Sequence, residues 1–179
     1  MMTRISDAVK HDHALIQRAF HQLREADPDV RKPDEFVWAL DRYLIVEDLV
    51  VSPALDNHIT KGKERHRRLS EDVDSINEKL RHMQAYKPAE ASFDASLSAI
   101  WVDLEPHMRE ETVTSGDLGL LEASLSREAS ESLGRRYEDI RELLQRPYGE
   151  DGVPDQRTLT AILEMPREEL MVKLGVSGE

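Results

Sequence analysis

Apolar residues recur in alternating steps of three and four along this chain, and that spacing places them on one face of a helix. The pattern occupies four segments, at residues 5–23, 33–57, 62–83 and 97–111. No stretch alternates cleanly as a strand would, because the β-branched residues are scattered. Short connections join helices of similar length, so the sequence predicts an all-α fold, an up-down-up-down four-helix bundle.

The sequence beyond the fourth segment is more polar, and it divides the chain in two. We expect residues 1–122 to form the bundle and residues 123–179 to form a C-terminal helical extension packed on it. A polar helix is expected from about Ser126 to Gln145, with Ser126 as its N-cap. A short apolar piece around Leu159–Leu163 and a last turn near Leu170 follow. We identify no chemical motif in the extension.

Composition limits the classes of partner and site. The chain has 179 residues and a formal net charge of -12, which argues against nucleic acid or anionic membrane as the main partner. It has no cysteine, so disulfides, thiolate chemistry and cysteine-ligated metals are excluded. No signal peptide or transmembrane run is visible near the N-terminus, and we expect a cytoplasmic protein. The sequence indicates no oligomeric state.

Each of the four apolar stripes also contains a side chain that can bind a metal. In chain order these residues are His13, Tyr43, Glu47, His66, His107 and Glu111. Two pairs, Tyr43 with Glu47 and His107 with Glu111, have the spacing i, i+4 that places both side chains on one face. Buried carboxylates and imidazoles are costly unless they are protonated, paired or bound to a cation, and no lysine or arginine lies on these stripes. A cation therefore explains the pattern, and iron, manganese or zinc suits such ligands.

A second interpretation needs no metal. A single histidine on an apolar face is usually a hydrogen-bonded core residue, and Glu47 and Glu111 could reach water at the edges of their stripes. The chain would then be a metal-free helical interaction module in which Tyr43 marks a decayed site. The coincidence of such residues across four helices favours the metal.

Four fragments, in this order, resemble the hemerythrin-like HHE cation-binding domain: AVKHDHALI, EDLVVSPAL, ERHRRLSEDV and HMREE. The resemblance covers roughly residues 4–122, and LSREASESL with the tail resembles the extended fungal members. It implies a four-helix bundle that holds two non-haem irons, bridged by carboxylates and capped by histidines. By position, the histidine ligands would be His13, His66 and His107, and the bridging carboxylates Glu47 and Glu111.

Tyr43 departs from the family pattern, which has a histidine at that position of the second helix. Three interpretations remain open. Tyr43 is a phenolate ligand to ferric iron, or a protonated phenol that hydrogen-bonds Glu47 or a metal-bound water, or a space-filling residue in a site that has lost one metal. A phenolate would stabilise ferric iron, whereas oxygen binding needs reduced iron.

The resemblance therefore implies a non-haem di-iron protein that acts in oxygen or redox sensing, iron handling or peroxide chemistry rather than in oxygen transport. Its small-molecule partners would be dioxygen, peroxide or nitric oxide. The sequence does not decide whether the protein is an enzyme, and it identifies no catalytic residue.

Overall fold

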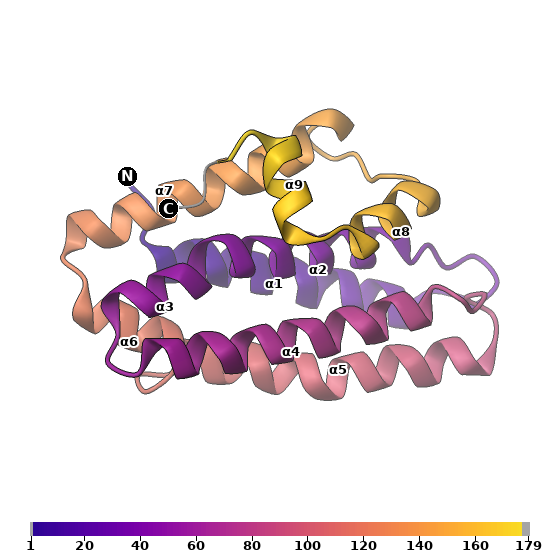
Figure 1. Ribbon diagram of the computed structural model, residues 1–179. Helices are drawn as coiled ribbons and strands as arrows, with labels where there is room; N and C mark the ends of the chain where they lie inside the picture. Colours follow the sequence, from indigo (N-terminus) through magenta and orange to yellow (C-terminus); the bar gives the residue numbers. More distant parts are fainter. Residues whose placement is uncertain (1, 177–179) are drawn as a thin grey trace.

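The computed structural model describes residues 2–176, and within that range the secondary structure is helical with no strand. The expected all-α fold is confirmed. Four long helices lie lengthwise beside one another (Figure 1): α1 (Ile5–Glu25), α2 (Asp34–Val46), α4 (Gly62–Met83) and α5 (Ala91–Thr112). The contacts of α1 with α2 and of α4 with α5 are among the most extensive between helices of the described chain.

The second apolar segment forms a continuous rod of three pieces. A π-helical turn, η1 (Glu47–Val51), joins α2 to α3 (Ser52–His58). Pro53 accounts for this wide turn, because proline lacks an N–H and its ring crowds the carbonyl group of the residue four positions earlier. The N–H of Ser52 accordingly bonds to the carbonyl oxygen of Glu47, five residues back. The sequence analysis did not predict this turn, which begins at one of the expected ligands.

The C-terminal part of the described chain is also helical. It contains α6 (Asp117–Ser124), α7 (Arg127–Gln145), the 3-10 turn η2 (Arg146–Tyr148), α8 (Gln156–Glu164) and α9 (Arg167–Leu174). Ser126 caps α7 as predicted, since its side-chain oxygen accepts a hydrogen bond from the N–H of Ala129 at 3.1 Å. Helix α6 was not predicted as a separate element. Residue 1 of the expected bundle and residues 177–179 of the expected extension lie outside the described range.

Helix α7, drawn in orange in Figure 1, packs along α1 and α2. The buried carboxylate of Asp12 on α1 accepts hydrogen bonds from the hydroxyl of Tyr137 at 2.7 Å and from Nη1 of Arg141 at 2.8 Å. Gly134 permits a close approach of α7 to the N-terminal residues, because a Cβ there would lie 2.1 Å from the carbonyl oxygen of Thr3. Polar contacts therefore attach α7 to α1, in addition to apolar packing.

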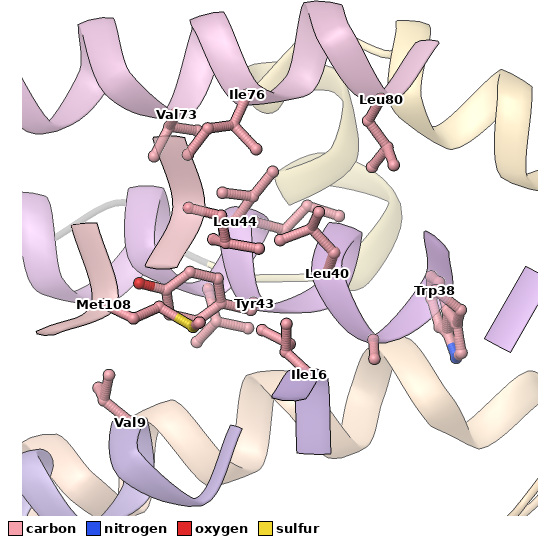
Figure 2. Close-up of a cluster of buried hydrophobic side chains, with 14 of the residues drawn as sticks. Val9, Ile16, Trp38, Leu40, Tyr43, Leu44, Val73, Ile76, Leu80 and Met108 are labelled. Carbon is pink, nitrogen blue, oxygen red and sulfur yellow. The ribbon is translucent and has the colours of Figure 1, made fainter. Parts of the chain in front are cut away.

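The apolar core lies between the long helices, and the side chain of Tyr43 is buried within it. Figure 2 shows Val9 and Ile16 of α1 below Tyr43, and Val73 and Ile76 of α4 above it. All these side chains are buried, and Tyr43 itself is 0% exposed. The hydroxyl of Tyr43 therefore needs a partner inside the protein. None of the helices in residues 2–176 combines the length and the hydrophobicity that a bilayer-spanning helix requires.

Candidate metal centre

Three of the six predicted ligands meet inside the helical bundle. Glu47, His107 and Glu111 each present one potential ligand atom, and these three atoms lie within 4.8 Å of one another. Glu47 belongs to η1, whereas His107 and Glu111 are one turn apart on α5. The two carboxylates are 0% and 4% exposed, so both have been withdrawn from water. His107 and Glu111 thus share one face of α5, as the i, i+4 spacing predicted, and they lie close to the buried carboxylate of Glu47 from η1.

His13 of α1 and Tyr43 of α2 lie against the same carboxylate, Glu111. Nε2 of His13 is 3.6 Å from Oε1 of Glu111, and Nε2 of His107 is 3.2 Å from Oε2. The hydroxyl of Tyr43 donates a hydrogen bond to Oε2 of Glu111 at 2.9 Å and lies 3.3 Å from Nε2 of His13. Five of the six predicted residues are therefore together. We call His13, Tyr43, Glu47, His107 and Glu111 the acid–histidine cluster.

His66, the sixth predicted ligand, is not in this cluster. Its Nδ1 lies 2.7 Å from Oδ2 of Asp56, and its side chain is 36% exposed. Six residues later, about 9 Å further along α4, Asp72 places Oδ2 at 3.3 Å from Nδ1 of His107. A carboxylate in that position orients the imidazole of a metal-binding histidine. The sequence analysis missed Asp72, whose only signal was its place at the edge of the apolar stripe, next to Val73.

Several polar atoms of the cluster are buried without a well-aligned hydrogen bond. They are Oε1 and Oε2 of Glu47, Oε1 of Glu111 and Nε2 of His107. Burial raises the pKa of Glu47 well above its usual value, and the neighbouring charge of Glu111 raises it further. Buried, unpartnered polar groups destabilise a folded protein. The donor set therefore fits a cation, which would supply the positive partner that Glu47 lacks.

The two residues of the α5 pair hold opposite charges. Burial tends to lower the pKa of His107, but its contacts with Asp72 and Glu111 outweigh burial and raise that pKa to about 10. Burial tends to raise the pKa of Glu111, but its contacts with His107 and His13 outweigh burial and hold that pKa below the usual value. A bound cation would replace the proton on His107, because a ligating imidazole nitrogen must be unprotonated.

Tyr43 keeps its proton in this setting. Burial raises the pKa of its phenol well above the usual value, and the charges of Glu111 and Glu47 act in the same direction. The phenol donates to Glu111, so its geometry agrees with the second of the three interpretations of Tyr43, the protonated phenol. The acceptor, however, is Glu111 and not Glu47.

A cleft connects the cluster with solvent. It has a volume of about 580 Å³, and His107 and Glu111 are part of its lining, together with Asp72 and Glu110. Arg65 and Asp117, which pair at 2.8 Å, lie on another part of its wall. Small molecules and ions can therefore approach His107 and Glu111 from one side, between α4, α5 and the start of α6.

Comparison with protein families matches residues 4–112 to the hemerythrin HHE cation-binding domain. Among curated proteins, an uncharacterized hemerythrin-like protein of Schizosaccharomyces pombe is 30% identical over 141 residues. That alignment covers 76% of this chain and 68% of the relative. No solved structure gave a match. The family match contains all six predicted ligands.

Proposed function

Since this chain belongs to the hemerythrin HHE cation-binding family, we propose that it binds iron in the acid–histidine cluster. The observation that carries this proposal is the convergence of Glu47, His107 and Glu111 within 4.8 Å, with both oxygens of Glu47 buried and unpartnered. Oxygen and nitrogen donors of this kind suit iron, and manganese or zinc would also be compatible with them.

We further propose that the cluster takes two iron ions that share the carboxylates of Glu47 and Glu111. The support is that the two oxygens of Glu111 face different imidazoles, Oε1 facing His13 and Oε2 facing His107. Each histidine would then hold one ion. We leave His66 out of this ligand set because its imidazole ring is paired with Asp56, close to the connection between α3 and α4, and not with the acid–histidine cluster.

The finer features expected from the sequence are part of the same proposal. The four long helices would form the up-down-up-down bundle of residues 1–122, and residues 123–179 would be the extension that covers it. The contacts of α7 with α1 and α2, and of α8 with α2 and α4, support the packing of the extension on the bundle. The protein would act in the cytoplasm.

Bound iron would supply a centre that exchanges single electrons between its ferrous and ferric states. Around it, Asp72 would orient the imidazole of His107, and the hydroxyl of Tyr43 would donate a hydrogen bond to Glu111. The cleft beside His107 gives dioxygen, peroxide or nitric oxide a route to the cluster. The proposed role is oxygen or redox sensing, iron handling or peroxide chemistry rather than oxygen transport, because Tyr43 stands where the family pattern has a histidine ligand.

The metal content of the purified protein tests the proposal. We expect about two iron ions per chain after anaerobic reconstitution with ferrous iron, as in other di-iron helical bundles. Elemental analysis of the fresh and the reconstituted protein measures this directly. Near-zero iron, manganese and zinc in both samples would contradict the proposal and favour the metal-free interaction module.

The optical spectrum of a Tyr43→Phe variant decides how Tyr43 takes part. Because the hydroxyl of Tyr43 donates to Glu111, we expect it to remain a donor beside the iron, so that the ferric protein shows no phenolate charge-transfer band and the variant has an unchanged visible spectrum. Iron content serves as the control and should equal that of the wild type. A visible band that disappears in Tyr43→Phe would establish phenolate ligation instead.

A further inference from the structure

Arg167, the first residue of α9, reaches the rod that carries two of the cluster residues. Its Nε donates a hydrogen bond to Oδ2 of Asp48 at 3.0 Å, which joins residues 119 positions apart in the sequence. The side chains of Arg167 and Asp48 are 21% and 16% exposed, so the ion pair is largely shielded from solvent. Asp48 directly follows Glu47 within η1. The contact therefore links the C-terminal segment to the turn that presents Glu47.

A second buried carboxylate, that of Asp41, also lies within reach of the positive charge of Arg167. Asp41 lies seven residues before Asp48, close to two helical turns, so both carboxylates fall on about the same side of the rod. Asp41 is 0% exposed, and neither of its carboxylate oxygens has a hydrogen-bond partner. Nη1 of Arg167 is likewise buried without a partner, and the positive charge of Arg167 acts on both carboxylates. His66, which also acts on Asp48, is engaged with Asp56.

Helix α9 is held by a small set of contacts. It has eight residues, of which Leu170 is buried, while Met171 and Leu174 are partly buried against the apolar core. A π-helical turn such as η1 is a rare conformation that is frequent at functional sites. The side-chain contact that α9 makes with this turn is the ion pair of Arg167 with Asp48.

We propose that Arg167 is a positioning residue for the metal centre: by holding Asp48, it fixes η1 so that the carboxylate of Glu47 faces His107 and Glu111. This inference rests on the proposed function. Because coupling between two events is reciprocal, metal binding and the docking of α9 strengthen each other. The extension thereby acquires a role, as the segment that holds the ligand turn in its binding geometry.

The test uses Arg167→Met in the full chain, because methionine keeps an apolar stem and removes the charge. The affinity for ferrous iron is measured under anaerobic conditions by competition with a chromogenic chelator. We expect Arg167→Met to bind iron about tenfold more weakly, the size of effect that follows when a side chain supporting a ligand is lost. Arg167→Lys keeps the charge without the guanidinium, and we expect it to recover most of the affinity.

Arg157→Met is the matched control, because Arg157 is an exposed arginine of the neighbouring helix α8. It should bind iron as the wild type does. Hydrogen exchange gives a second readout: iron should slow exchange in residues 167–174 of the wild type and of Arg157→Met, but not of Arg167→Met. Equal iron affinity of Arg167→Met and the wild type would overturn this inference alone. A wild type that binds no iron would overturn the proposed function and this inference with it.

Discussion

Replacing Glu111 by glutamine is expected to remove most of the iron from the protein. Glu111 is 4% exposed and lies against both cluster histidines and the hydroxyl of Tyr43. Glutamine has nearly the same shape, so packing is preserved while the negative charge and one anionic donor are lost. Altering residues that merely support a ligand costs about 10–100-fold in metal affinity. Loss of a shared ligand should exceed that range, as measured by competition titration and elemental analysis.

Two control variants make this result specific. Glu110→Gln removes an exposed acid next to Glu111 that lines the same cleft, and it should keep the wild-type iron content. His66→Ala removes the histidine that the family resemblance assigned as a ligand but that pairs with Asp56. It too should keep its iron. Retention of iron by Glu111→Gln, or its loss from His66→Ala, would show that the ligand set is wrong.

Replacing Glu47 by glutamine is expected to change stability in opposite directions with and without iron. Both carboxylate oxygens of Glu47 are buried without a partner, so the charged form destabilises the metal-free fold. Glu47→Gln should therefore raise the melting temperature of the metal-free protein, by about 5 °C for a gain of about 2 kcal/mol. Iron at a thousandfold excess over its dissociation constant should raise the melting temperature of the wild type by about 10 °C. Iron should not raise the melting temperature of Glu47→Gln.

The stability difference between the metal-free wild type and Glu47→Gln should change with pH in a predictable direction. Burial raises the pKa of Glu47 in the folded protein above its unfolded value of about 4.3. The folded state therefore binds this proton more tightly, and the stability of the metal-free wild type falls as the pH rises above that unfolded value. The advantage of Glu47→Gln should grow from pH 4 to pH 8. Thermal melts across this range check it, and a metal-free variant that melts below the wild type at pH 8 would contradict the account.

Periodicity predicted the faces of the helices well. The alternation of three and four located helices α1, α2, α4 and α5, and the i, i+4 spacing of His107 and Glu111 placed both side chains together because they belong to one helix. A spacing within a helix is set by the helix itself. It needs no knowledge of how neighbouring helices pack, which is why this pair and its orientation toward the interior could be read from the sequence.

The axial offset between helices could not be read in this way. His66 lies on the predicted face of α4, but at the end that meets α3, where Asp56 is its partner. Periodicity fixes which residues share a face, whereas the level at which two helices meet depends on the connection between them. The π-helical turn before Pro53 also shifts that level. Contacts between residues far apart in the sequence, such as Arg167 with Asp48, produce no periodic pattern from which they could be predicted.

The most direct test is crystallographic, with anomalous difference maps recorded on both sides of the iron absorption edge from crystals of the iron-replete protein. The account predicts iron peaks among Glu47, His107 and Glu111, with the second peak on the side of His13. A map without iron at these side chains, or with iron at Asp56 and His66 instead, would contradict it.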